Sequence, residues 1–491
     1  MARPKDGAFI EGLVIDPQSG IPMHRQIYVN LREMILSGSL RGGARMPSSR
    51  ALSQHLSVSR FTVVTALDQL TAEGYLRPIE GSGTYVETIL NIGDHSGSQS
   101  APPKDTWSGD AMLSKHARNL SWRDSRVSNK TSKYLHMSAP DHRLFPFQIW
   151  AKLTKDLFSK VDSHVMWYRD GDAPSLLEQQ IASQIAVSRG IRCDPEEVVT
   201  TLGAHHAVNL LTELLLDPGD TVAFEEPGMQ AIYSTFRSHG CNVLQMPVDE
   251  NGANPSSLPG RRIKLAFVTA AKQQPLAITM PAKRKLEMLN WASENNAVIV
   301  EDDLGSEFRY EGRPIPPLKA MDRSDRVIYI GAFSMSLLQT LRVGYMIMPR
   351  QLAARCRRLI QVRYRATPQI TEQILAHFIA DGHYSRHLHK TRRIYARRQE
   401  HLLDILRRDF ADRFEPPAFS AGFYNMCYFR DQTVDDDQII ARCNDRNLGV
   451  EQLSYYYRSG ASPRKGMLVG FASSDEEEIT KGCAILQRCL G

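Results

Sequence analysis

The sequence of 491 residues lacks the features that mark membrane and secreted proteins. It has no apolar run of about 18 uncharged residues, which is the length that a membrane-spanning helix needs. Its first residues, Met1 to Asp6, are too polar for a secretory signal peptide. We therefore expect a cytoplasmic protein without a membrane partner. Hydrophobic residues make up 42% of the chain and charged residues 23%, as in ordinary globular proteins of two or three domains.

Paired cysteine motifs are missing as well. The seven cysteines are odd in number and contain no C-x-x-C pair, which argues against a disulfide framework and against a zinc site. We expect reduced thiols and no metal-binding residues. The net charge of +6 is mild and by itself only permits a polyanionic partner.

Residues 10–86 have the pattern of a small helical domain that ends in a hairpin. Apolar residues recur at helical spacing over 23–37, and a second, short helix is predicted over 48–56 with a serine at its start. A third helix follows Ser59, which is its expected N-cap. Two short extended pieces around a Gly-rich turn occupy 75–86. Three helices followed by a hairpin predict a winged helix-turn-helix.

The charge of this module is one-sided. Between Ile21 and Val86 the sequence has seven arginines, no lysine and four acidic residues. Such an excess of positive charge suits the phosphates of DNA. For Arg25, Arg32 and Arg41, however, a solvated surface position is the favoured interpretation.

The stretch PSSRALSQHLSVSRFTVVTALDQLTAEGYLRPIEGSGTYV resembles the winged helix of GntR-type regulators over its whole length. The resemblance implies double-stranded DNA as a partner, with promoter half-sites read in the major groove by the third helix. One arginine at the start of this helix and a second one helix earlier would contact base edges or phosphates. Short hydroxyls would contact phosphates, and a wing glycine would let the backbone approach the minor groove. The residues implied are Arg50, Ser59, Arg60, Thr62 and Gly81.

Residues 87–132 separate this module from the rest of the chain. Gly, Ser, Pro, Asp and Lys dominate there, and such a composition cannot bury enough apolar surface to order itself. We expect a flexible linker, with a helix over 111–120 as an alternative for part of it.

From residue 133 to the end, apolar strand-like runs alternate with helical patterns. This alternation predicts an α/β domain with a mainly parallel sheet, whose ligands bind at the carboxyl ends of the strands. A helical block over 353–410 and a small α+β piece beginning at Phe414 complete the domain. The predicted strands are 198–200, 221–224, 265–268, 298–300, 327–330 and 345–348.

Segments of this half resemble the aminotransferase-like domain of MocR-type regulators, among them LLDPGDTVAFEEP at 215–227 and EDDLGSEFRY at 301–310. Both halves together resemble the MocR-type subfamily of GntR transcriptional regulators. The resemblance implies a fold-type I aminotransferase-like domain over 133–491 with a mainly parallel, seven-stranded sheet. It also implies pyridoxal phosphate as the family cofactor and a head-to-tail homodimer.

Carried over residue by residue, the resemblance implies a cofactor site that has lost contacts. Asp302 matches the carboxylate that pairs with the pyridinium nitrogen, and Arg342 matches the phosphate ligand. The Schiff-base lysine is replaced by Met335, the tyrosine at the ring hydroxyl by Leu304, and the stacking aromatic residue by Met229. Because a thioether cannot form an imine, we expect no covalent cofactor, no catalytic residue and no transaminase activity.

Further departures lie in the same pocket. The family's Ser-Gln-Gln is Ala204-His205-His206 here, and Lys272 stands first in the segment that would read His-Gln-x-Pro-x-Gly. We predict that the domain binds a small anionic or amino-group metabolite as effector, with Arg342 and Lys272 as charge partners. Tyr424 and Arg458 are further candidates.

Several alternatives stay open. A closed pocket would leave the domain as a dimerisation scaffold. Pyridoxal phosphate could bind without a covalent bond through Asp302 and Arg342, or Lys272 could supply a substitute amine. Either would make the protein a PLP-responsive regulator or an aminotransferase-class enzyme. Asp302 could instead only cap its loop or pair with Arg309.

Overall fold

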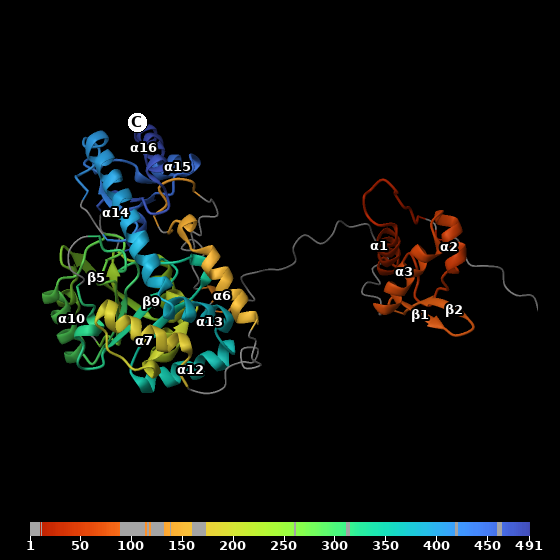
Figure 1. The fold of residues 1–491 in the computed structure, drawn as a ribbon, viewed down its shortest axis with the longest axis horizontal. Coiled ribbons are helices and arrows are strands. Elements are labelled where there is room, and N and C mark those ends of the chain that lie inside the picture. Colours follow the sequence, from red (N-terminus) through yellow and green to blue (C-terminus); the bar gives the residue numbers. More distant parts are fainter. Residues whose placement is uncertain are drawn as a thin grey trace, which may run out of the picture. The chain divides into compact units, whose positions relative to one another are not determined.

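The computed structural model describes residues 10, 12–88, 113–114, 117–118, 132–137, 139–159, 173–259, 262–310, 315–417, 421–458 and 464–491. The chain divides into two compact units, Met1–Trp107 and Ser108–Gly491 (Figure 1). Most of the predicted linker over 87–132, and of the alternative helix within it, lies outside the described residues.

The first unit has three helices and a hairpin. Ser48 Oγ accepts a hydrogen bond from Ala51 N at 3.2 Å, and Ser59 Oγ accepts one from Thr62 N at 3.1 Å, so both serines cap helices. The two short strands pair antiparallel. The elements are α1 (Met23–Leu36), α2 (Ser49–Leu56), α3 (Arg60–Ala72), β1 (Leu76–Ile79) and β2 (Gly83–Val86).

One apolar core joins these elements. Helix α3 buries Val63, Ala66 and Leu70, which lie on one face because their spacing follows the helical period. They pack with apolar residues of α1, α2 and both strands. Since this face is turned inward, Arg60 and Phe61 at the start of α3 stay exposed.

The second unit is built on an eight-stranded sheet of order β3-β10-β9-β8-β7-β4-β5-β6. Neighbouring strands from β9 to β5 are parallel, whereas β10 is antiparallel to both its neighbours. Six of these strands match the predicted apolar runs, and two more, β5 and β6, bring the seven-stranded sheet implied by the resemblance to eight. Strand β6 forms where the turn after β5 folds back. The strands are β3 (Val198–Thr201), β4 (Thr221–Glu226), β5 (Asn242–Asp249), β6 (Gly252–Ala253), β7 (Leu265–Val268), β8 (Val298–Asp302), β9 (Val327–Ala332) and β10 (Gly344–Ile347).

Helices cover both faces of this sheet. Val222 and Phe224 of β4 face a cluster with α8, α9 and α12, while Ala223 between them faces a second cluster with α10 and α11. Successive side chains of a strand point to opposite faces, so both faces are apolar. The helices are α6 (Phe147–Ser159), α7 (Leu176–Arg189), α8 (Ala204–Leu215), α9 (Gln230–Ser238), α10 (Ala282–Glu294), α11 (Leu318–Met321), α12 (Arg350–Tyr364), α13 (Gln369–Ala380) and α14 (His383–Asp409).

A small α+β part follows α14, as predicted from Phe414 onward. Its three-stranded antiparallel sheet has the order β11-β13-β12. Helix α14 runs from the large sheet to this part (Figure 1), and its buried Arg398 is held by Asp141 at 2.9 Å. The elements are β11 (Tyr424–Tyr428), α15 (Asp436–Asp445), β12 (Glu451–Gln452), β13 (Gly466–Gly470) and α16 (Glu476–Leu490).

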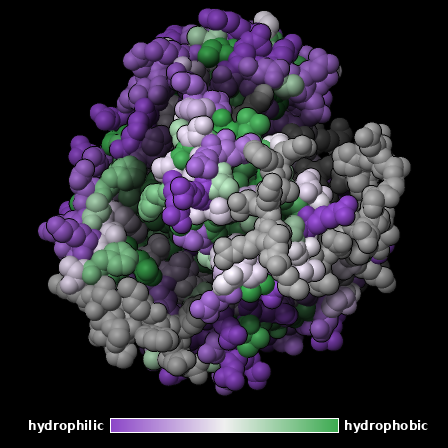
Figure 2. Space-filling model, turned by 90° about the vertical axis from the view of Figure 1, so that its right-hand side faces the viewer, coloured by the Kyte–Doolittle hydropathy of each residue, from purple (hydrophilic) through white to green (hydrophobic). Residues whose placement is uncertain are grey.

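One face of the molecule shows how polar and apolar side chains are distributed on the surface. The face shown in Figure 2 carries mostly hydrophilic side chains, and its hydrophobic ones lie in scattered groups. Among the described residues, no helix combines the length and the apolar composition needed to cross a bilayer.

Candidate effector cavity and DNA-binding surface

A cavity of about 320 Å³ lies at the carboxyl ends of the parallel strands of the second unit. Loops that follow neighbouring strands meet at this edge of an α/β sheet, which is where such folds bind ligands. Met229 follows β4, Lys272 follows β7, Asp302 ends β8 and Met335 follows β9. The predicted pocket residues that line the cavity are His205, Met229, Lys272, Asp302, Leu304, Met335 and Arg342.

His206 was predicted in the same pocket but is not among the lining residues. Its Nδ1 accepts a hydrogen bond from Leu202 N at 3.0 Å, and its ring packs edge to face on Tyr364 with centroids 4.7 Å apart. Burial and the nearby charge of Arg342 lower the pKa of the His206 ring. His206 therefore stabilises the turn that leads into α8.

One end of the cavity is suited to an anion. Helix α8 has no side-chain cap after Gly203, so its first N–H groups have no partner inside the helix. Such groups bind anions, and Gly203, Ala204 and His205 all line the cavity. Arg342, whose φ of 53° lies in the left-handed region, adds a guanidinium to the same wall.

Asp302 is a buried carboxyl in this wall, with only 3% of its surface exposed. It accepts a hydrogen bond from the backbone of Leu304, while burial and the neighbouring Asp303 raise its pKa to about 7. Arg189 Nη2 lies 2.6 Å from Asp303 Oδ1. Among the described residues the acid of this segment that pairs with an arginine is therefore Asp303, and the hydrogen bond from Leu304 agrees with the alternative in which Asp302 caps its loop.

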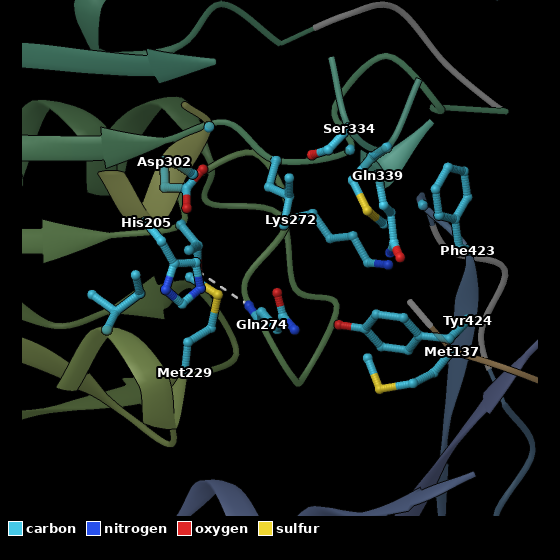
Figure 3. A pocket seen from close by; sticks show the side chains of 18 of the residues that line it. Met137, His205, Met229, Lys272, Gln274, Asp302, Ser334, Gln339, Phe423 and Tyr424 are labelled. Atoms are coloured by element: carbon cyan, nitrogen blue, oxygen red, sulfur yellow. Dashed lines mark hydrogen bonds between the residues drawn. The ribbon is translucent and has the colours of Figure 1, made fainter. Parts of the chain in front are cut away.

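Lys272 extends through the cavity. Figure 3 shows Asp302 and His205 on one side, Tyr424 and Phe423 on the other, and the Lys272 side chain directed toward the second pair. Its Nζ lies 3.5 Å from the centroid of the Tyr424 ring. Burial lowers the pKa of this amine to about 7.

The loop that carries Lys272 is fixed by buried polar contacts. Gln273 Nε2 donates to Pro227 O at 2.8 Å, and Gln274 N donates to Thr269 Oγ1 at 3.1 Å. Thr269 Oγ1 in turn donates to Glu225 Oε2 at 2.5 Å. Burial raises the pKa of Glu225 to about 7. Lys272 thus stands on a rigid base at the end of β7.

The opposite wall is closed by Gly422, which the sequence prediction missed. Its N–H donates to Phe308 O at 2.8 Å and its carbonyl accepts from Tyr310 Oη at 2.6 Å. A Cβ at position 422 would lie 2.1 Å from Lys272 Nζ. Only glycine therefore leaves room for the extended lysine, and its φ of 82° also favours glycine.

Tyr424 and Arg458, the two further pocket candidates from the sequence, lie in different places. Tyr424, the first residue of β11, lines the cavity next to Gly422. Arg458 is not among the lining residues, because its guanidinium lies over the Tyr233 ring, 3.9 Å from the centroid.

The first unit presents the predicted DNA-contacting residues around the start of α3. Arg60 is exposed there, and its Nε donates to Ser49 Oγ at 3.1 Å. The hydroxyls of Ser59 and Thr62 lie 2.8 Å apart. Arg50 in α2 is exposed.

Gly81 is exposed at the hairpin tip with a φ of 74°. The sequence prediction missed Phe61, which lies next to Arg60 and has 80% of its surface exposed. In the sequence, the position of this aromatic residue directly after Arg60 could have indicated it as a DNA-contacting residue.

Comparison with known proteins agrees with these two units. Residues 23–86 match the family described as "Bacterial regulatory proteins, gntR family", and residues 132–485 match "Aminotransferase class I and II". The chain is 31% identical over 477 residues to "Probable rhizopine catabolism regulatory protein MocR" of Rhizobium meliloti, covering 96% of this chain and 94% of that protein. It belongs to the MocR-type GntR regulators.

Other MocR-type relatives are similar over nearly their whole length. The pyridoxine biosynthesis transcriptional regulator PdxR of Corynebacterium glutamicum is 28% identical, with 95% of this chain and 96% of PdxR covered. The kynurenine aminotransferase of Pyrococcus horikoshii shares the fold of the second unit, with a TM-score of 0.69 at 23% identity over 78% of this chain and 98% of that chain. The predicted winged helix and fold-type I domain are thereby confirmed, and the protein is a transcription regulator.

Pyridoxal phosphate is the cofactor implied for the aminotransferase fold family. Residue 335 is a methionine, so the cavity has no amine at this position. Its side chain is half-buried and packs against the main apolar core. Leu304 and Met229 line the cavity without a hydroxyl or a ring. Asp302 and the anion-binding end remain, but these residues do not fit a covalently held cofactor, and we derive no step through it.

Proposed function

We propose that this MocR-type regulator responds to a small anionic metabolite that binds in the cavity of its second unit. The main support for this proposal is that the start of α8 and Arg342 form an anion-binding end in an open cavity. The same cavity has no amine at position 335. The volume of about 320 Å³ suits a small metabolite. The open cavity favours a ligand site over a scaffold with a closed pocket.

The ligand would be held at two places. The N–H groups at the start of α8 and the Arg342 guanidinium would bind a carboxylate or phosphate. Lys272 and the Asp302 carboxyl would face the remainder of the ligand, because both line the same cavity.

The first unit would read DNA through the start of α3. Arg60 and Arg50 would contact base edges or phosphates, Ser59 and Thr62 phosphates, and Gly81 would bring the wing to the minor groove. We add Phe61 to this surface, since an exposed ring there can contact a thymine methyl group.

Regulation would follow if the effector binds two arrangements of a dimer with different affinities. A head-to-tail homodimer would place two winged helices on operator half-sites. Val362, Tyr364 and Ile370 are large apolar residues left exposed on neighbouring helices, which supports an interface in this region. Sedimentation of the full-length protein as a dimer is the expected result, and a monomer at micromolar concentration would contradict this part.

Ligand binding is tested by the thermal shift of the full-length protein with inorganic phosphate, carboxylates, amino acids and amines. The affinity for a stabilising anion, obtained from the thermal shift at several anion concentrations, should fall about tenfold or more in Arg342→Gln, because the guanidinium contact is lost. Arg350→Gln is the matched control, since Arg350 is exposed and is not among the cavity residues. If no anion stabilises the protein, or if both variants respond alike, the effector proposal is wrong.

DNA binding is tested by footprinting at the promoter of the adjacent genes. The slope of log K against log salt should be several units, and Arg60→Ala should lose sequence preference. Arg77→Ala is the control, because Arg77 is exposed in β1 and paired with Glu87 at 3.4 Å. Binding that ignores sequence or salt in the intact protein would refute this assignment.

We also propose that the cavity does not catalyse transamination. Met335 has no amine that could form an imine and no basic group for the proton shift. Assays of the purified protein with amino acids, 2-oxo acids and added pyridoxal phosphate should show no turnover. Turnover above that of a heat-denatured sample would favour the enzyme alternative.

A further inference from the structure

The second unit contains two buried lysines with different surroundings. Lys285 in α10 is fully buried, which lowers the pKa of its amine, although the nearby Glu301 opposes that shift; its Nζ donates to Pro316 O at 2.7 Å. Lys272 has 8% of its surface exposed and forms no hydrogen bond or ion pair with any residue that the structure describes. Its Nζ instead lies over the ring face of Tyr424. Lys285 is a structural residue, whereas the Lys272 amine is left for another role.

The Lys272 side chain is also held in an extended shape inside a cavity. Gly422 lies directly against the amine, and the loop on which Lys272 stands is fixed by Gln273 and Thr269. The amine is directed into the cavity toward Phe423 and Tyr424 (Figure 3). An amine that is held in place without a hydrogen-bond or ion-pair partner among the described residues is the arrangement that a nucleophilic lysine requires.

We propose that Lys272 is a reactive amine that forms a reversible imine with the carbonyl group of an anionic ligand, such as an aldehyde acid or a 2-oxo acid. This inference rests on the proposed function, because the same cavity must first bind the anion. Arg342 and the start of α8 would hold the carboxylate while the carbonyl carbon meets Lys272 Nζ. The position of the amine differs from residue 335, where the family resemblance places its lysine.

The chemistry balances without any oxidant or reductant. The neutral amine adds to the carbonyl carbon, forming a C–N bond while the carbonyl electron pair moves to oxygen. A proton passes from nitrogen to this oxygen to give a carbinolamine, which loses water to form the C=N bond. Hydrolysis restores the free lysine and the ligand, so the adduct reports ligand concentration reversibly.

The protonation state supports this role. With a pKa of about 7, roughly half of the Lys272 amines are neutral at neutral pH, on the order of a thousandfold more than for an unperturbed lysine. Desolvated lysines of this kind are the ones that form Schiff bases. The neighbouring cavity wall adds Asp302, His205 and Arg342 as its ionisable groups.

The test traps the imine in the full-length protein at neutral pH. Glyoxylate, pyruvate and succinic semialdehyde are each added with sodium cyanoborohydride, and the protein is analysed by intact mass and peptide mapping. We expect at least one probe to give one saturable adduct per chain, located on Lys272. Lactate, which has the carboxylate but no carbonyl, should give no adduct and should slow the trapping.

Two variants sharpen the result. Lys272→Met keeps the length and removes the amine, so it should lose the adduct at least tenfold. Lys283→Met removes an exposed lysine of α10 and should behave as the wild type. Peptide mapping of the wild-type protein gives the same answer if Lys272→Met fails to fold.

The outcomes separate this inference from the proposed function. Thermal stabilisation by the probes without any adduct overturns the imine and leaves the effector site standing. An adduct spread over exposed lysines, or one retained in Lys272→Met, also overturns it. If the probes and the other anions give neither stabilisation nor an adduct, both proposals fail.

Discussion

The Lys272 Nζ lies 3.5 Å from the centroid of the Tyr424 ring. The two residues are far apart in the sequence and belong to different sheets, because Lys272 follows β7 and Tyr424 begins β11. Their contact closes one side of the cavity. It leaves a buried amine without a carboxylate partner among the described residues, and several measurable consequences follow from that.

The stability of the protein should depend on pH through Lys272. Its pKa is about 7 in the folded chain against 10.5 for an ordinary lysine. Between these values the unfolded state holds a proton that the folded state lacks, so stability rises with pH. Relative to Lys272→Met, wild-type stability should increase by up to about 1.4 kcal/mol per pH unit between roughly pH 7 and pH 10. Urea unfolding at several pH values measures it, and a flat difference would disprove it.

Asp302 should make the stability of the protein fall, not rise, with increasing pH. Its pKa is raised from 3.8 to about 7, so between these values the folded state holds a proton that the unfolded state has lost. Stability therefore falls as pH rises through this window, and the loss is complete above it. Asp302→Asn should be more stable than the wild type above about pH 7 and equal to it near pH 4. Equal stabilities at both ends would contradict the burial of this carboxyl.

Gly422→Ala should destabilise the second unit and displace Lys272. The added Cβ would lie 2.1 Å from Lys272 Nζ, and the left-handed φ of 82° adds strain. Gly190→Ala is the matched control, because it shares a φ of 71° but meets no atom within 4 Å. The control should lose about 1 kcal/mol, and Gly422→Ala about 1 to 3 kcal/mol more. If urea unfolding gives a similar loss of stability for Gly422→Ala and Gly190→Ala, Lys272 does not pack against residue 422.

Phe61→Ala should weaken operator binding without affecting the fold. The ring has 80% of its surface exposed, so the stability of the first unit should change by less than about 0.5 kcal/mol. Loss of an apolar base contact should lower operator affinity on the order of tenfold. Leu36→Ala, at the exposed end of α1, is the control for a general loss of apolar surface. Gel-shift titration compares the variants, and unchanged affinity in Phe61→Ala would remove this residue from the DNA-binding surface.

Local sequence rules predicted much of this architecture. The serine caps at Ser48 and Ser59 follow from side-chain chemistry over three residues. Buried parallel strands such as β8 and β9 follow from short apolar runs. Strand β5 escaped prediction because its burial is irregular and its sequence shows no apolar run.

The cavity was predictable in its residues but not in its contacts. Seven residues line it because family positions fall at the ends of successive strands. His206 faces away, since neighbouring residues on a helix point in different directions. The approach of Gly422 to Lys272 depends on how the small sheet packs on the large one, and no local pattern contains that information.

The hydrogen bond from Arg60 Nε to Ser49 Oγ has a consequence for recognition. A free arginine side chain samples many rotamers, and ordering it on DNA opposes binding by about 0.5 to 1.5 kcal/mol. Here the guanidinium is already tethered across α2 and α3 while its two terminal nitrogens stay available. If Arg60 contacts an operator as proposed, its side chain would already be ordered before binding, and Ser49 would influence affinity without touching a base.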